Sequence, residues 1–496
     1  MRNHIYYSFV SVRGWGRRAV SRSLQILSPL GLVLAGLALL AGGCGSPSSG
    51  SCAAGSGCVT LALSAAGLAA AGDSLTLDDL ELIIRVGETT RRVRFDDRVL
   101  RPPTELPLLL PELAADAEQR IAIYARAHIN IGSSGSQELT AAIIRPAGQA
   151  LAASYPLVLA RACVAAPCAI PEPRRGAALA LDPHSRHLVL FGGRRQDGTP
   201  LADTWEWDGL GWQQAAVASA PPARAGHGLA LDVRRGNLLL FGGAGGPEAA
   251  PQLFADTWEY RGAAAGWSQI ASGGPPARQQ AAMAGAALGS GSPGLLLHGG
   301  IDAGGATLGD TWLWDGQTWT APPLASDPCQ AAPPLTATLP RCRSQAALIP
   351  AAAPSQPALL VGGLLGPAGS LQSAETDNSV WQWDGAAWSP AAVYRPPTVL
   401  LRYGHFAGSA AAASGGLALV AFGDSASGLR QDSFLLDLKT GQFAPQLGPA
   451  PPPRSEAAVA YDEERDEVFL LGGRGKSGLL GDAFSFTPVA GWRVHQ

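Results

Sequence analysis

The sequence is short of several residue types, and each shortage narrows what the chain can be. Only 15% of its 496 residues are charged, and only two are lysines, Lys439 and Lys476, so nearly all positive charge is arginine. Glycine and proline are abundant, with 62 and 39 residues. This composition disfavours a helical protein and is typical of many short strands joined by turns.

Acidic side chains are absent from the N-terminal segment, where none precedes Asp73. Five arginines lie before an uncharged run over residues 26–43, which predicts a secretory signal peptide over residues 1–43. The run ends in Leu-Ala-Gly-Gly-Cys44, which resembles the lipobox of bacterial lipoproteins. The resemblance implies that Cys44 carries the lipid, palmitate included. A plain signal peptide or a short membrane anchor is the alternative.

The mature chain is expected to be acidic. Removal of the five arginines would leave 31 bases against 39 acids, a net charge of −8, which argues against a nucleic-acid partner. Residues 44–58 are rich in Gly and Ser and predict a flexible tether behind the lipid. Gly45, rather than Asp, follows the cysteine, and this resembles lipoproteins of the outer membrane. We therefore expect a lipid-anchored protein of the cell envelope.

Seven cysteines remain few for 496 residues, and their number is informative. A lipidated Cys44 leaves an even number, which favours disulfides in an exported chain. Their spacing lacks nearby histidines, so we predict no metal site. Proximity favours pairing each with its neighbour, with Cys58–Cys163 as the alternative. The six residues are Cys52, Cys58, Cys163, Cys168, Cys329 and Cys342.

Short apolar runs separated by Gly, Pro, Asp or Ser predict a first β domain over residues 59–169. About seven strands are expected, with a hairpin that turns near Gly87, and residues 113–119 could form a short helix. This number of strands suits a small β-sandwich. Its one histidine, His128, is interpreted as structural.

Residues 174–496 contain six copies of one pattern. Each copy has an arginine, an apolar run that ends in a glycine pair, a loop, and two spaced aromatic residues. The fifth copy is interpreted as having Gly423-Asp424 in place of the pair, and phenylalanines in place of tryptophans. The six arginines are Arg174, Arg224, Arg278, Arg343, Arg402 and Arg454.

This pattern resembles kelch repeats, and Arg224-Ala-Gly-His227 and Arg402-Tyr-Gly-His405 match the first strand of that family best. The resemblance implies an all-β fold, a six-bladed kelch-type β-propeller behind the β-sandwich. All four strands of the last copy are expected before Gln496, so closure of the ring requires no strand from the N-terminal segment.

Residues that recur in every copy are interpreted as structural. We expect the six arginines to bond main-chain carbonyls and the tryptophans to pack between blades. Function is expected in the departures, which are long loops at 244–255, 320–341 and 364–378. The b–c and d–a connections of a four-stranded meander emerge on one face, so these loops predict a binding surface there. Its candidate residues are Leu364, Leu365, Leu371, Glu375, Asp377 and Asn378.

No catalytic residues and no cofactor are predicted. A copper site like that of galactose oxidase is not supported, because the propeller has too few unassigned Tyr, Cys and His residues. We therefore expect a protein- or glycan-binding scaffold module, with the membrane reached through the lipid. The alternative is a periplasmic or secreted carbohydrate-active enzyme that resembles galactose oxidase or sialic acid epimerase propellers.

Overall fold

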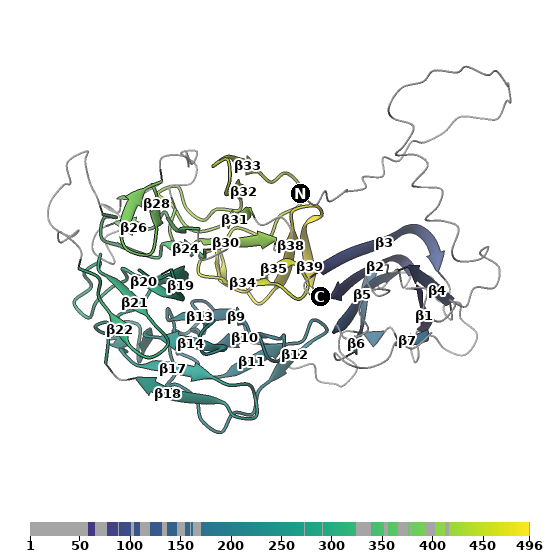
Figure 1. Cartoon of the computed structure of the whole chain (residues 1–496), viewed down its shortest axis with the longest axis horizontal. Coiled ribbons are helices and arrows are strands. Elements are labelled where there is room, and N and C mark those ends of the chain that lie inside the picture. Colours follow the sequence, from purple (N-terminus) through teal and green to yellow (C-terminus); the bar gives the residue numbers. More distant parts are fainter. Residues whose placement is uncertain are drawn as a thin grey trace, which may run out of the picture.

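Every element in the described part of the chain is a β-strand, as a computed structural model shows (Figure 1). The structure describes residues 58–64, 77–87, 89–100, 104–109, 120–130, 136–145, 154–158 and 160–161. From 170 to 495 it describes all residues except 272, 290, 324–338, 352–355, 366–374, 377–378, 392–401 and 412–415. No helix of these residues is long and apolar enough to cross a membrane.

The N-terminal strands form two sheets, in the regions where apolar runs predict them. The smaller has the order β4-β1-β7 and the larger β3-β2-β5-β6-β8. The hairpin between β2 and β3 turns at Gly87 as expected, whereas the possible helix at 113–119 lies outside the described residues. The strands are β1 (Cys58–Ser64), β2 (Leu77–Val86), β3 (Thr89–Leu100), β4 (Thr104–Leu109), β5 (Ile121–Asn130), β6 (Ser136–Arg145), β7 (Ser154–Val158) and β8 (Ala160–Arg161).

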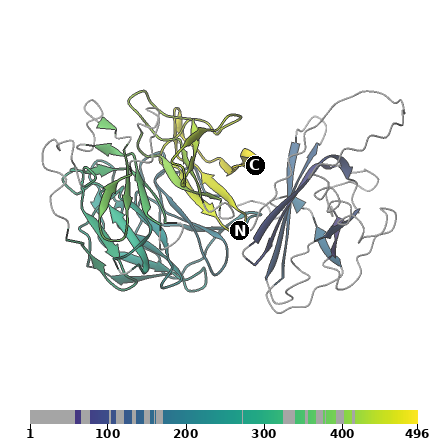
Figure 2. The ribbon, with the colours of Figure 1, turned by 45° about the horizontal axis from the view of Figure 1, so that its top comes forward.

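Strand β2 is buried on both of its faces. Successive side chains of a strand point to opposite sides, so Leu80, Leu82 and Ile84 share one face and Glu81 and Arg85 share the other. None of these five side chains is more than 4% exposed. Figure 2 shows the larger N-terminal sheet between the smaller sheet and the rest of the molecule.

Six four-stranded antiparallel sheets follow one another between residues 178 and 495, each with its strands in sequence order. We call them blades one to six. Their strands are β9 (Ala178–Leu181), β10 (Leu188–Phe191), β11 (Thr204–Trp207) and β12 (Trp212–Gln214); β13 (Gly228–Asp232), β14 (Asn237–Phe241), β17 (Thr257–Tyr260) and β18 (Trp267–Ala271); β19 (Ala282–Ala287), β20 (Pro293–His298), β21 (Thr311–Trp314) and β22 (Trp319–Thr320); β24 (Ala347–Ile349), β25 (Ala358–Val361), β28 (Val380–Trp383) and β29 (Trp388–Pro390); β30 (Phe406–Ala411), β31 (Leu417–Ala421), β32 (Ser433–Asp437) and β33 (Phe443–Pro445); β34 (Ala458–Asp462), β35 (Glu467–Leu471), β38 (Ala483–Thr487) and β39 (Gly491–His495).

The first strands of neighbouring blades contact one another, and β34 of blade six contacts β9 of blade one, so the blades close into a ring. The predicted all-β propeller fold is therefore confirmed. Each blade buries its apolar faces against its neighbours; Leu188 and Leu190 of blade one, for example, pack in one cluster with Phe469 of blade six. Blade six takes all its strands from residues 458–495, so no strand is exchanged where the ring closes.

The expected register of the fifth copy is wrong by one residue. Phe422 and Gly423, not Gly423 and Asp424, occupy the position of the glycine pair, with φ angles of 62° and 96° that match Gly192 and Gly193 at 66° and 103°. The carbonyl of Phe422 also accepts the bond from Arg402 that the first glycine accepts in other copies. A buried, left-handed phenylalanine thus replaces a glycine, which the glycine-based alignment could not find.

Candidate functional site

The repeated arginines bond main-chain carbonyls, as the sequence predicts, and fix the entry of each blade to its own glycine pair. Each Nη1 donates to the carbonyl of the first residue of its glycine pair, at 2.8 to 3.1 Å, and none of the six residues is more than 1% exposed. A buried guanidinium needs such acceptors to replace water. The recurring arginine is therefore part of the scaffold.

The repeat also contains an aspartate that sequence reasoning did not identify. Asp256 accepts both Nη1 and Nη2 of Arg224, at 2.6 and 2.8 Å, and also the indole N–H of Trp258 at 2.7 Å. Burial alone would raise the pKa of Asp256, but the bonds from Arg224 and Trp258 outweigh it and lower the pKa. Its sequence signal is an acid two residues before the first tryptophan. The equivalent acids are Asp203, Asp310, Asp432 and Asp482, and Ser379 stands at this position in blade four.

Six backbone hydrogen bonds form a closed circle around the propeller axis. The donors and acceptors are the residues that lie two positions after each repeated arginine and two before each first strand. In each blade this N–H donates to the carbonyl of the equivalent residue one blade earlier, at 2.7 to 3.0 Å, and Gly176 bonds Glu456 to complete the circle. We call these six residues the channel rim: Gly176, Gly226, Gln280, Gln345, Gly404 and Glu456.

All six rim residues have left-handed backbone conformations, with φ between 52° and 66°. Glycine adopts this region freely, whereas a residue with a Cβ atom is strained there by about 1 kcal/mol. Three blades use glycine and the other three use Gln280, Gln345 and Glu456. Because the same backbone is built without strain by glycine, the three long side chains are not needed to form the ring.

The side chains of Gln280, Gln345 and Glu456 make contacts along the circle of hydrogen bonds. Gln345 donates to the side-chain carbonyl of Gln280 at 3.0 Å, and Glu456 accepts from Arg175 at 3.0 Å. A Cβ atom added to Gly404 would lie 2.9 Å from Oε1 of Gln345 and 3.7 Å from Cγ of Glu456. The rim therefore presents two amides and a carboxylate, all partly exposed, at one end of the ring of first strands.

Charged residues of the b–c loops surround the rim. Arg175, which neighbours the rim, forms ion pairs with Glu456 and with Glu248 of the long loop in blade two. Arg474 pairs with Asp424 at 2.8 Å and lies 3.8 Å from Glu456. Both signs of charge are thus balanced at this end, and the side chain of Arg474 is 41% exposed. The arrangement can hydrogen-bond a polar ligand but has no surplus charge of one sign.

The six predicted binding residues do not share one environment in the structure. Leu364 and Leu365 form β26 (Leu364–Leu365), which pairs with β23 (Arg343–Ser344) and with β27 (Glu375–Thr376). The two leucines are only 5% and 6% exposed, so the expectation that they are apolar surface contacts is wrong.

The physical reason is that Leu364 occupies a repeat position. Ala244 and Ile301 directly follow the glycine pair in their own blades, pair with the entry to the first strand, and are equally buried. Glu375 lies on β27, whose strand position is described and whose side chain is not. Leu371, Asp377 and Asn378 lie outside the described residues, so the loop remains a predicted surface.

The second long loop folds back over the rim. Residues 244–255 form a hairpin of β15 (Ala244–Gly245) and β16 (Gln252–Leu253), whose turn holds Glu248. Arg194 of blade one donates to the carbonyls of Gly246 and Gly198 at 2.8 and 2.7 Å. This loop and the rim, which Arg175 links through Glu248 and Glu456, therefore belong to one surface, which we call the b–c and d–a face.

Cys342 is disulfide-bonded and buried at the base of the 320–341 loop. Cys44, Cys52, Cys163, Cys168 and Cys329 lie outside the described residues, as does the side chain of Cys58, so the structure does not identify the partner of Cys342. The predicted pairing and the lipid anchor stay predictions. In the part of the chain that is described, no group of three or more His, Cys, Asp or Glu residues is placed to hold a metal ion.

His227 is buried and His405 is half-buried, and both imidazoles are neutral at physiological pH. Burial, with Arg224 nearby, lowers the pKa of His227 to about 3, and burial with Arg402 does the same for His405. His227 packs edge-on against Phe191 of blade one, with ring centroids 5.5 Å apart. These imidazoles are packing elements between blades, which agrees with their interpretation as repeat positions.

Comparison with known proteins identifies relatives of this architecture. Residues 162–345 match the model of the KLHDC2/KLHL20/DRC7 Kelch-repeats domain. A solved structure titled "Structure of YjhT" is similar at 16% identity and a TM-score of 0.48, over 66% of this chain and 99% of that chain. That likeness is too low to carry an argument, and no curated protein matches.

The family match covers the first three copies and the start of the fourth. The arginine–glycine bonds and the ring of first strands extend the same geometry through blades five and six. The ring of this chain is therefore a kelch-repeat β-propeller.

Proposed function

We propose that this protein is an exported, lipid-anchored binding module whose propeller holds a protein or glycan partner on the b–c and d–a face. The observation that carries the proposal is the channel rim. Gln280, Gln345 and Glu456 keep strained conformations that glycine would adopt freely at the same positions. Strained side chains that the fold does not require are typical of ligand-contacting sites.

The chemistry of the rim indicates the kind of partner. Amide side chains both donate and accept hydrogen bonds, and Arg175 and Glu456 add one donor and one acceptor group of opposite charge. The exposed Arg474 beside them extends this polar surface. A partner rich in hydroxyl or amide groups satisfies such a site better than a phosphate or an apolar helix does.

The first experiment separates binding from folding. Gln280→Gly and Gln345→Gly remove the side chains and relieve strain, so we expect unfolding midpoints equal to or above that of the parent protein. A photo-crosslinking amino acid at position 280 of the anchored protein should trap one partner in the envelope. In the Gln345→Gly background the yield of this adduct should fall at least tenfold.

The matched control is position 439. Lys439 is exposed on the c–d turn of blade five, at the opposite end of the blade from the rim. A crosslinker there should give no adduct of the same mass. Equal adducts from both positions, or an adduct that Gln345→Gly leaves unchanged, would exclude the rim as the binding site.

The lipid anchor has its own test. Cells that express the full chain should incorporate labelled palmitate into it, and Cys44→Ala should abolish the label and release the protein from the membrane fraction. Cys52→Ala is the control, because it removes a cysteine eight residues away. Label that persists in Cys44→Ala would disprove the anchor without touching the proposal for the rim.

A further inference from the structure

Each blade is connected to the next by a chain segment, except that no segment within the propeller connects blade six to blade one. We call the contact between these two blades the closing seam. In many propellers the last sheet combines strands from both ends of the chain and so closes the ring. Here each blade is built from its own consecutive strands. Side-chain contacts and the rim bonds must therefore hold the closing seam.

Several other contacts between neighbouring blades, which we also call seams, include a hydrogen bond from a tryptophan that the closing seam lacks. Trp267, Trp319 and Trp388 each donate to a threonine hydroxyl of the preceding blade, at 2.9 to 3.0 Å. Trp212 is the equivalent residue of blade one, but the preceding blade has Ala483 at the acceptor position, which has no hydroxyl.

A polar bond that fastens the contact between blades two and three is also missing. Trp314 of blade three donates to Asp232 in the a–b turn of blade two at 2.7 Å. At the closing seam, the equivalent Trp207 has no partner for its buried N–H among the described residues. The equivalent acid, Asp462, is instead bonded by Arg465. The closing seam keeps aromatic packing, with Trp207 and Phe469 5.1 Å apart, but loses these polar bonds.

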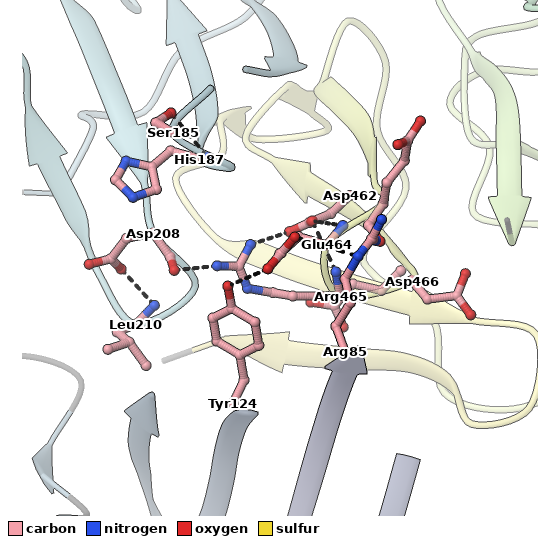
Figure 3. Close-up of polar contacts among 12 residues, drawn as sticks. Arg85, Tyr124, Ser185, His187, Asp208, Leu210, Asp462, Glu464, Arg465 and Asp466 are labelled. Atoms are coloured by element: carbon pink, nitrogen blue, oxygen red, sulfur yellow. Dashed lines mark hydrogen bonds and ion pairs between the residues drawn. The ribbon is translucent and has the colours of Figure 1, made fainter. Parts of the chain in front are cut away.

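The larger N-terminal sheet lies directly against this place, as Figure 3 shows. Arg465 of blade six bonds the carbonyl of Asp208 in blade one, and so spans the seam. The ring of Tyr124, from β5, covers its guanidinium at 4.4 Å, and the Tyr124 hydroxyl donates to Glu464 at 3.1 Å. Arg465 and Glu464 are both 0% exposed, so the N-terminal sheet seals this contact from water.

Further ion pairs fix the sheet to blade six. Arg126 of β5 donates both of its terminal nitrogens to Glu467, at 3.0 and 2.6 Å, with both side chains nearly fully buried. Arg493 of the last strand bonds Glu81 of β2 at 2.6 Å. This explains why β2 carries buried charges on one face. Buried pairs of this geometry fix orientation, and removal of one partner leaves an uncompensated charge.

We infer that the N-terminal domain is the clasp of the propeller: it covers the Arg465–Asp208 contact and holds the first and last blades together in place of an exchanged strand. In the seam between blades two and three, Arg235 makes the equivalent bond to Gly316 but its side chain stays 28% exposed. The clasp is therefore specific to the closing seam and independent of the partner proposed for the rim.

Hydrogen exchange of the full chain tests this inference. Arg126→Gln/Glu467→Gln removes both charges together and keeps hydrogen-bonding amides in their place. We expect at least tenfold faster exchange of the Gly176 and Gly473 amides, whose bonds cross the closing seam. The Gln345 amide, which makes the equivalent rim bond between blades three and four, should be unchanged.

Tyr124→Phe provides a milder second variant should the double substitution not fold, since it removes only the bond to Glu464. Arg91→Ala, an exposed position on β3, is the matched control and should alter neither seam. Equal acceleration at both seams, or none at the closing seam, in the variants that fold would overturn the clasp.

Discussion

At the scale of single residues, the protein uses buried charge as a repeated fastening. Each blade holds a guanidinium that is bonded to a main-chain carbonyl, and five of the six have an aspartate within reach. The acid and the arginine come from segments about 30 residues apart, so each pair fixes the entry of a blade to its third strand. Loss of the acid would leave the arginine buried without its counter-charge.

Asp256→Asn should therefore destabilise the chain by about 2–3 kcal/mol, because Arg224 is 0% exposed and would be left buried without its carboxylate partner, which is itself only 16% exposed. Chemical denaturation measures this directly. Asp437→Asn is the control. Asp437 accepts hydrogen bonds from two backbone amides of an exposed turn, and an asparagine side chain can accept the same bonds. A cost below 0.5 kcal/mol for Asp256→Asn would show that the pair contributes little.

The buried histidines predict a pH dependence. In the folded protein burial lowers the pKa of His227 from 6.5 to about 3. Between these values the unfolded chain binds a proton that the folded chain does not, so stability falls as the pH falls from 6.5 towards 3. The free energy of unfolding of His227→Gln should fall less steeply over this range than that of the parent protein, with a slope smaller by about 1 kcal/mol per pH unit. His184→Gln, at an exposed position, should follow the parent protein.

At the scale of elements, the seams between blades depend on a matched pair of residues. The tryptophans of four blades bond a hydroxyl of the preceding blade, offered by Thr204, Thr257, Thr311 or Ser433. Trp212 at the closing seam is the exception, because the preceding blade has Ala483 there. Where the aromatic is Phe443, the preceding blade has Val380, and the two pack in one apolar cluster. The loss of tryptophan in blade five is thus paired with the loss of the hydroxyl, so this blade is adapted rather than defective.

Thr257→Val should cost about 1–2 kcal/mol, because it leaves the Trp319 indole N–H buried without an acceptor. Val380→Thr should also destabilise, since Phe443 cannot donate to the new hydroxyl. Adding Phe443→Trp should recover about 1 kcal/mol of that loss. Additive effects in this double-mutant cycle would show that the two positions do not interact.

At the scale of the whole molecule, the two ends of the propeller have different roles. The N-terminal domain lies against blade six (Figure 1), where Tyr124 bonds Glu464 in the a–b turn, whereas the rim lies at the other end of the blades, just before each first strand.

The clasp predicts that the full chain unfolds in a single transition. Buried pairs such as Arg126–Glu467 couple the domain to the ring, so neither part should melt first. Scanning calorimetry should give equal calorimetric and van't Hoff enthalpies for the parent chain. Arg126→Gln/Glu467→Gln should separate the trace into two transitions. Two transitions in the parent chain would contradict tight coupling.

The sequence alone determined the architecture, because its information is local and repeated. Apolar runs, glycine pairs and spaced tryptophans are properties of one blade, and six copies make the pattern clear. The main-chain role of the six arginines followed for the same reason. A local rule also produced the error at Leu364, since the residues after a glycine pair look like a loop but are held in a bridge to the next first strand.

Only the tertiary structure decided which departures lie together. Gln280, Gln345 and Glu456 are separated by more than 60 residues, and nothing local marks them as neighbours; the circle of hydrogen bonds does. Likewise Arg126 and Glu467 read as ordinary strand residues, and their meeting beside the closing seam depends on how two domains dock. Contacts between distant segments follow from the packing of whole elements, which a pattern of period two within one strand does not encode.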